Sequence, residues 1–353
     1  MFSFFITNIF LRSIVACLTA FLAGLCFAPF CIKFLKKHGL VDEGKSPSLE
    51  IRKEHALKEG TPVMGGLIIL FGFLFSLIIW GNFSCAYVNL CLISMIGFSI
   101  IGALDDVVKS KTAKNGLSAK KKMGLLIIVA GLLSGGLWYM IMDHPELSKF
   151  FIPCYGFVSI PWYAGIIFIL FSMYVILGSS NAVNLTDGMD GLAIGCVIIA
   201  CVSFAIMSFI TGHFKLAAIF SLPYVQNAQE LSICCSAIIG ASCSFLWHNS
   251  FPATIFMGDC GSLMLGGFLG FIAIVLRQEL LLILIGLVFV IEAITVILQV
   301  TSYKLRKKRI FLCAPIHHHF RRSGLTETKI IARFWIIALL GNILGLCLFF
   351  YLY

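Results

Sequence analysis

The chain alternates between long apolar runs and short polar segments. Several of these runs reach the roughly 18 to 20 residues that a helix needs to cross a bilayer. Ten apolar runs lie at about 14–32, 63–80, 87–104, 123–142, 162–177, 192–210, 231–247, 262–276, 280–300 and 330–352. The pattern predicts an all-α polytopic membrane protein with about ten transmembrane helices, in a single domain over residues 1–353.

The composition points to the same class of protein. Of 353 residues, 60% are hydrophobic and only 12% are charged, and the mean hydropathy is +1.01, whereas soluble domains carry about a quarter charged residues. The 14 cysteines are scattered through the apolar runs without the spacing of a metal site or a disulfide framework, so we interpret them as small core residues. The first apolar run shows no clear cleavage site and is predicted to remain as a helix.

Basic residues are concentrated in three of the polar segments. Residues 33–62 hold seven, 105–122 hold six and 304–333 hold nine, which is 22 of the 26 Lys and Arg residues. Because Lys and Arg are enriched in cytoplasmic loops, the pattern predicts that these segments are cytoplasmic and that both termini are outside. The net charge of +10 is mostly this excess, and it requires no nucleic-acid partner.

Five aspartates fall in segments predicted to share the cytoplasmic side: Asp105, Asp106, Asp187, Asp190 and Asp259. Carboxylates close to the hydrocarbon are energetically costly and usually functional. Beside lysine-rich loops, they indicate a site for a divalent cation and an anionic ligand. Oxygen ligands of this kind suit magnesium or manganese, whereas zinc prefers nitrogen and sulfur.

The segment 181–191 places two carboxylates and two carboxamides between two apolar runs. Asp187 and Asp190 are three residues apart, so a helix beginning there would stack both on one face. The alternative is a turn in which an aspartate caps the next helix.

Two other polar segments contain candidate binding residues. Lys58 precedes a glycine- and proline-containing loop, which is predicted to hold this lysine near the membrane. Asp259 lies between glycines at the predicted start of a helix, where a bound metal could bridge to a phosphate. Phe256, three residues earlier, is either a packing residue or a platform on which a base stacks.

A run of three histidines follows the ninth apolar run. Consecutive positions on a helix point in different directions, so the triplet alone is a poor three-histidine metal site. Imidazoles beside phosphates donate hydrogen bonds, and the alternative is solvated loop histidines. Glu292 lies deep in the ninth run, with Gln299 seven residues later on the same face, and it is predicted to make a polar contact between helices.

Together these motifs resemble the polyprenyl-phosphate N-acetylhexosamine-1-phosphate transferases over essentially the whole chain. The matching segments are GTPVMGG at 60–66, LDD at 104–106, GLSAK at 116–120, NAVNLTDGMDGL at 181–192, FMGDCGSLMLGG at 256–267 and PIHHHF at 315–320. The Thr-Pro-x-Met-Gly-Gly and Pro-Ile-His-His-His forms are similar to the branch that uses N-acetylmuramoyl-pentapeptide rather than N-acetylglucosamine.

The resemblance implies a ten-helix, often dimeric protein of the inner membrane, with its active site on the cytoplasmic face. It implies transfer of phospho-MurNAc-pentapeptide from UDP-MurNAc-pentapeptide to undecaprenyl phosphate, giving lipid I and UMP for peptidoglycan synthesis, with magnesium (Mg2+). By the same resemblance the catalytic residues are Asp105, Asp106, Asp259 and Lys58, and Asp259 is the metal ligand. Implied substrate contacts are Lys122, Asn184, Asp187, His317, His318 and His319, with Asp190, Asn249, Phe256 and Gln299 in the uridine pocket.

Alternatives remain at this level. Within the family, an N-acetylglucosamine-1-phosphate transferase is possible. Outside it, a cation-coupled transporter would ordinarily carry its carboxylates near the membrane midplane, whereas these cluster near one face. For the transfer itself, direct attack by the lipid phosphate competes with a covalent intermediate on a carboxylate. Direct attack is preferred because a phosphate monoester, with a second pKa of about 6, needs no strong base at neutral pH.

The distribution of basic residues yields a topology prediction. In a variant stripped of native cysteines, single cysteines placed at residues 45 and 308 should be labelled from the cytoplasm, and one at residue 146 from outside. Labelling of residue 308 only from outside would contradict this orientation and indicate the opposite one.

Overall fold

The computed structural model describes residues 8–42, 60–112, 116–143, 149–152, 156–159, 161–222 and 224–351. Within these ranges, nine helices are long and apolar enough to cross a membrane, and α4 (Gly66–Trp80) is a shorter apolar helix at the place of the second predicted run. The prediction of an all-α polytopic membrane protein is confirmed.

The long helices follow the predicted apolar runs. Besides α4 they are α2 (Ile9–Lys37), α5 (Ala86–Lys111), α6 (Ala119–Asp143), α7 (Gly165–Thr186), α8 (Leu192–Thr211), α10 (Gln229–Asn249), α11 (Gly258–Val275), α13 (Leu287–Arg306) and α15 (Glu327–Tyr351). The shorter helices are η2 (Trp162–Ala164), α9 (Phe214–Ile219), α12 (Leu282–Ile285) and α14 (Ile316–Arg322). A short antiparallel hairpin joins α6 to η2 and consists of β1 (Lys149–Ile152) and β2 (Gly156–Ser159).

Three sequence-based boundaries were wrong. Asp105 and Asp106 do not end their helix, because α5 continues to Lys111. The fifth run was predicted to end at residue 177, but α7 continues to Thr186. Of the two alternatives for Asp187 and Asp190, the structure has the turn, although no aspartate caps α8, which starts at Leu192 as predicted. Gly191, with φ +81°, accommodates the left-handed backbone of that turn. The ninth run is divided into α12 and α13, and α13 extends to Arg306.

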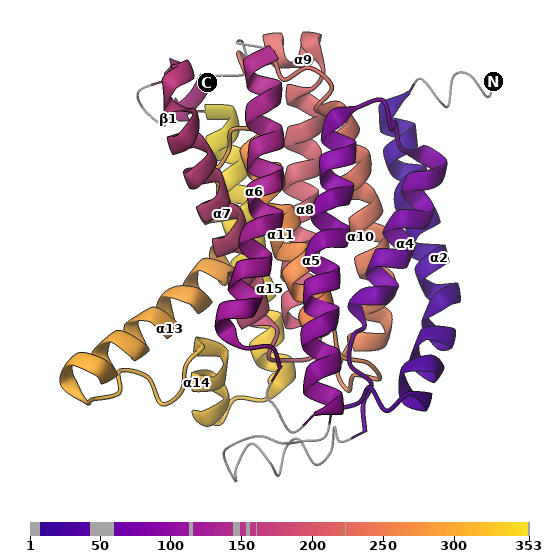
Figure 1. Ribbon diagram of the computed structural model, residues 1–353, viewed down its shortest axis with the longest axis vertical. Helices are drawn as coiled ribbons and strands as arrows, with labels where there is room; N and C mark the ends of the chain where they lie inside the picture. The colour runs from indigo at the N-terminus through magenta and orange to yellow at the C-terminus, as the bar shows by residue number, and fades with distance from the viewer. Residues whose placement is uncertain are drawn as a thin grey trace.

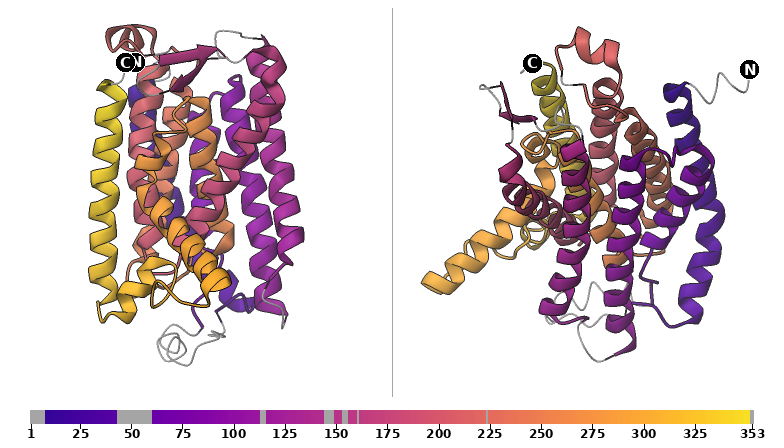
Figure 2. Two further views of the ribbon diagram at one scale, coloured as in Figure 1. Left: turned by 90° about the vertical axis from the view of Figure 1, so that its left-hand side faces the viewer. Right: turned by 45° about the horizontal axis from the view of Figure 1, so that its top comes forward.

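The helices stand side by side as a bundle with two different ends. Helix α2 begins and α15 ends at the top of Figure 1, whereas the end of α5, the start of α6, the turn after α7 and helix α14 lie at the bottom. We call this lower end the charged end. There α13 leaves the bundle obliquely, which the right panel of Figure 2 also shows. The basic residues at the end of α5, at the start of α6 and at the end of α13 therefore share one end, as the alternation of runs predicted.

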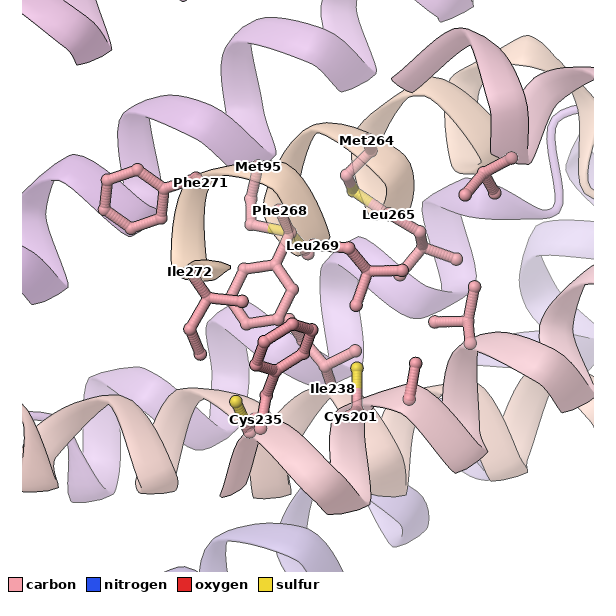
Figure 3. Close-up of a cluster of buried hydrophobic side chains, with 14 of the residues drawn as sticks. Met95, Cys201, Cys235, Ile238, Met264, Leu265, Phe268, Leu269, Phe271 and Ile272 are labelled. Carbon is pink, nitrogen blue, oxygen red and sulfur yellow. The ribbon is translucent and has the colours of Figure 1, made fainter. Parts of the chain in front are cut away.

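Helix α11 lies at the centre of the packing. It contacts α5, α7, α4 and α8, and all of its residues from Asp259 to Val275 are buried. Figure 3 shows Phe268, Leu269 and Ile272 of α11 among side chains of three other helices, including Met95, Cys201, Cys235 and Ile238. A polar group at the start of this helix is therefore held among fixed neighbours.

Close backbone approach holds α10 against α2. A Cβ atom on Gly240 of α10 would overlap the carbonyl oxygen of Cys17 in α2. At the end of this helix pair opposite the charged end, the Arg12 guanidinium lies 3.1 Å from the Glu230 carboxylate. Because lipid tails are as apolar as the helix surfaces, such packing and polar contacts are what hold membrane helices together.

We expect Gly240→Ala to lower the thermal unfolding temperature of the purified protein, because the new methyl group would push α10 away from α2. Overpacking of this kind typically costs about 1–3 kcal/mol. Gly178→Ala is the matched control, since nothing lies within 4 Å of the added carbon in helix α7. Equal unfolding temperatures for the two variants in detergent would contradict the close approach.

Candidate active site at the charged end

Carboxylates from three parts of the chain gather at the charged end of the bundle. Asp105 and Asp106 come from α5, Asp187 from the turn after α7, and Asp259 from the first turn of α11. The prediction that Asp259 opens a helix is confirmed, because α11 starts at Gly258. Asp105, Asp106 and Asp259 are buried.

Two lysines join Asp105 to Asp259. The Lys109 ammonium lies 2.6 Å from Oδ2 of Asp105 and 3.0 Å from Oδ2 of Asp259. The Lys122 ammonium lies 3.5 Å from Oδ2 of Asp105 and also contacts Oδ2 of Asp259. Two ammonium groups therefore bridge two carboxylates, an arrangement suited to holding the oxygens of a diphosphate.

Lys109 was missed as a site residue in the sequence and was counted only among the basic residues of its loop. The signal that identifies it is the i,i+4 spacing from Asp105, which places the two side chains on one helix face. This spacing is meaningful only because α5 continues past Asp105, and the apolar run had predicted an end there.

The second oxygen of Asp259 is held from α7. Asn184 donates from Nδ2 to Oδ1 of Asp259 at 3.0 Å and to the Ser262 hydroxyl at 2.8 Å. Asn184 was expected to contact substrate, and here it orients the aspartate. A hydrogen bond from Ser180 to the Leu263 carbonyl, at 3.0 Å, ties the same two helices together one turn further on.

The described part of this cluster has more carboxyl than ammonium groups. Four carboxyl groups gather near two ammonium groups, and loss of water raises the pKa of Asp187 to about 8. The neighbouring charges of Asp259, Asp106 and Asp190 act in the same direction. Asp187 is therefore largely protonated near neutral pH, and a cation bound nearby would favour its charged form.

The carboxylate oxygens of this cluster are suited to magnesium that is also bound by the phosphate oxygens of a substrate. Among the described residues, no three His, Cys, Asp or Glu side chains converge on one metal position. Proteins usually hold magnesium by one or two carboxylates with phosphate oxygens and water completing the shell, and the carboxylate of Asp259 is compatible with that role.

The loop that follows Lys58 lies beside Asp259. Gly65 donates its N–H to the Phe256 carbonyl at 2.8 Å, and Gly66 donates to the Met257 carbonyl at 3.0 Å. Phe256 donates in return to the Pro62 carbonyl at 2.8 Å. The two glycine-containing loops are thus paired through their backbones. Lys58 itself lies outside the described residues, so its role stays a prediction.

Polar residues expected in a uridine pocket are engaged with loop backbones. Asn249 accepts a hydrogen bond from the N–H of Gly191 at 2.9 Å and donates to the Ile255 carbonyl at 2.9 Å. Asp190 accepts from the N–H of Ala253 at 3.1 Å. These bonds join the turn after α7 to the loop before α11.

Gln299 plays the same part further along the charged end. Its Oε1 accepts from the N–H groups of Ile310 and Phe311, each at 3.0 Å, and its Nε2 donates to the Phe311 carbonyl. Phe256 is partly buried at the loop pairing described above. Contact of these residues with a nucleoside stays a prediction.

The three histidines lie on α14 and face different neighbours. His317 is buried with its Nδ1 3.1 Å from Oε1 of Glu292 on α13, which confirms Glu292 as a polar contact between helices. The other side of the His317 ring packs on Gly188. His318 lies with its ring centroid 4.2 Å from that of His317, and His319 accepts from the N–H of Leu312 at 3.2 Å. The triplet therefore joins α13 and α14 to the turn that carries Asp187.

Known proteins match this chain over nearly its full length. Residues 87–277 match the model of glycosyl transferase family 4. A phospho-N-acetylmuramoyl-pentapeptide-transferase of Buchnera aphidicola subsp. Baizongia pistaciae is 44% identical over 346 residues, which cover 95% of this chain and 97% of the relative. Proteins of the same name from Koribacter versatilis and Vesicomyosocius okutanii subsp. Calyptogena okutanii are each 42% identical, cover 95% of this chain, and are themselves covered over 91% and 92%.

The chain therefore belongs to glycosyl transferase family 4 and, within it, to the family of the phospho-N-acetylmuramoyl-pentapeptide-transferases. The family resemblance seen in the motifs is confirmed. The fold agrees with it, since the chain is a multi-pass membrane protein by the length and composition of its helices.

Asp187 should make the stability of the metal-free protein depend on pH. A carboxyl whose pKa is raised from 3.8 to about 8 stabilises the fold most at low pH and loses that contribution as pH rises toward 8. Asp187→Asn removes the titration, so its stability should fall less steeply than that of the wild type between pH 5 and 8, by up to about 1.4 kcal/mol per pH unit. Thermal unfolding in detergent with a chelator measures this, and parallel pH curves would contradict it.

Proposed function

We propose that this protein transfers phospho-MurNAc-pentapeptide from UDP-MurNAc-pentapeptide to undecaprenyl phosphate, forming lipid I and releasing UMP. The observation that carries the proposal is the bridging of Asp105 and Asp259 by Lys109 and Lys122 at the end of a membrane bundle. Such a site can meet a soluble nucleotide from one side and a lipid phosphate from the bilayer. The names of the relatives support the choice of sugar.

In this reaction an oxygen of the lipid phosphate forms a bond to the phosphorus that carries the sugar. The bond from that phosphorus to the bridging oxygen breaks, and UMP leaves with the electron pair. Positioning and neutralisation of charge dominate phosphoryl transfer. The ammonium groups of Lys109 and Lys122 would bind the diphosphate oxygens, which would replace the carboxylates as their partners.

The carboxylates then have separate parts. Asp259, oriented by Asn184, which also donates to Ser262, would hold magnesium, which supplies additional positive charge to the diphosphate when bound. Asp105 would orient the lipid phosphate or remove its last proton. We prefer direct attack over a covalent intermediate because the acceptor is already largely dianionic near neutral pH.

The proposal includes a location. The charged end carries the basic segments, so it would face the cytoplasm from an inner membrane, where the nucleotide substrate is soluble. A homodimer stays a prediction from the family resemblance. Against a cation-coupled transporter, whose carboxylates would ordinarily lie near the membrane midplane, the paired charges here come from the last turns of α5, the start of α6 and the start of α11.

The test uses the full-length protein in detergent with radiolabelled UDP-MurNAc-pentapeptide, undecaprenyl phosphate and magnesium. We expect lipid I and UMP in equal amounts, and no UMP when the lipid is omitted. Asp259→Asn should lower turnover by at least about a hundredfold, as for loss of a principal electrostatic group. Asp143→Asn, at the opposite end of α6 from Lys122, is the control and should leave turnover unchanged.

Three results would contradict parts of this proposal. Turnover of UDP-N-acetylglucosamine in place of the muramoyl substrate would favour the other branch of the family. A stoichiometric burst of UMP without lipid, with label retained on the denatured chain, would establish a covalent intermediate. Near-normal activity of Asp259→Asn would show that the Asp259 carboxylate is not required for transfer.

A further inference from the structure

Asp106 is buried against the start of α11 and is engaged through both of its oxygens. Oδ1 accepts a hydrogen bond from the backbone N–H of Asp259 at 3.1 Å, and Oδ2 accepts one from the backbone N–H of Cys260 at 3.0 Å. The carboxylate belongs to α5, and the two donors belong to the first turn of α11. One helix is therefore capped by a side chain from another helix.

Helix α11 has no cap of its own. The first four N–H groups of a helix lack partners within the helix, and they are usually met by a Ser, Thr, Asp or Asn just before it. Here that position is Met257, which has a helical backbone and makes no side-chain capping bond. Because this turn is buried, its donors cannot all rely on water, and an unpaired buried N–H is costly.

The local backbone makes room for the carboxylate. Gly258 has φ +70°, a conformation that glycine adopts at little cost. A Cβ atom at Gly258 would lie 2.5 Å from Oδ2 of Asp106. The carboxylate therefore occupies the space that any side chain at this position would need. One turn earlier on α5, a Cβ atom at Gly102 would overlap the carbonyl oxygen of Asp259. Helix α5 thus contacts the backbone of Asp259 at two points.

The neighbouring aspartate has different partners. Asp105 contacts the ammonium groups of Lys109 and Lys122, and it accepts the N–H of Leu117 at 2.7 Å. Asp105 therefore faces the charged centre, whereas Asp106 faces the backbone of α11. The two carboxylates of this pair perform different tasks.

We propose that Asp106 is a positioning residue that caps α11 from α5 and thereby fixes the carboxylate of Asp259. The expected effect on the rate of phospho-sugar transfer rests on the function proposed above, whereas the cap itself does not depend on that function. Loss of the cap would let the first turn of α11 shift, and a displacement of about 1 Å in a reacting centre can cost about a hundredfold in rate. The substrate-binding lysines would remain, so kcat should fall while KM for the nucleotide changes little.

Hydrogen–deuterium exchange of the intact protein in detergent tests the cap directly. In Asp106→Ala, the amides of Asp259 and Cys260 should exchange at least about tenfold faster than in the wild type, as expected for loss of a bond to a charged acceptor. The later turns of α11 should keep their protection. Asp105→Asn is the matched control, because the same helix is altered one residue away while both bonds from Asp106 to the backbone amides of α11 are kept.

Several outcomes would overturn the proposal. Equal exchange of the two amides in Asp106→Ala and Asp105→Asn would show that the carboxylate does not cap the helix. Uniformly faster exchange along α5 and α11 would indicate general unfolding rather than a local cap. If the alanine variant does not fold, Asp106→Asn serves instead, since its amide can offer only one accepting oxygen to the two donors and should give a smaller change at the same amides.

Kinetics separate positioning from direct contact with substrate. For Asp106→Asn we expect kcat to fall by about ten- to a hundredfold, with KM for UDP-MurNAc-pentapeptide within about threefold of the wild type. A rise in KM with unchanged kcat would assign Asp106 to substrate binding instead. A wild-type protein that makes no lipid I would refute the proposed function, and the amide exchange would still decide the cap.

Discussion

The contact between α5 and the first turn of α11 is the constraint on which the rest of the charged end depends. The start of α11 is buried and places Asp259 where it meets side chains from α5, α6 and α7. A helix start buried at such a depth requires partners for its N–H groups, and α5 provides them. The same contact brings the carboxylates of Asp105 and Asp259 close together. Lys109 and Lys122 offset the repulsion between these two carboxylates.

The loops at the charged end are organised by side-chain amides. Asn249 and Gln299 each bind backbone groups of a neighbouring loop, and the loops before α4 and α11 are paired through their own backbones. Backbone groups in loops have no regular partners, so each must be met by a side chain, another loop or water. The result is a set of loops whose positions are coupled, with His317 connecting them to α13.

The number and approximate position of the helices could be predicted because the apolar runs reflect the thickness of a bilayer. Helix ends could not, since residues such as Lys109 continue a helix beyond the apolar region and leave no hydrophobic signal. The segment at Asp187 was left open between a helix start and a turn, because the i,i+3 spacing of Asp187 and Asp190 is compatible with both. Asp259 and Asp105 could be selected as polar residues in costly places, but the partners of Asp106 and Asn184 depend on contacts between distant segments, which no local pattern records.

The approach of Gly240 to Cys17 bears on how such a chain can vary among organisms. Large side chains that face lipid can be exchanged for one another, since one apolar surface replaces another at little cost. A position where two backbones touch admits almost no substitution. Outside the active site, the positions that change most slowly among related sequences should therefore be glycines at which two helix backbones touch. Sequence drift in this protein would be governed by the distances between helix axes more than by hydrophobicity.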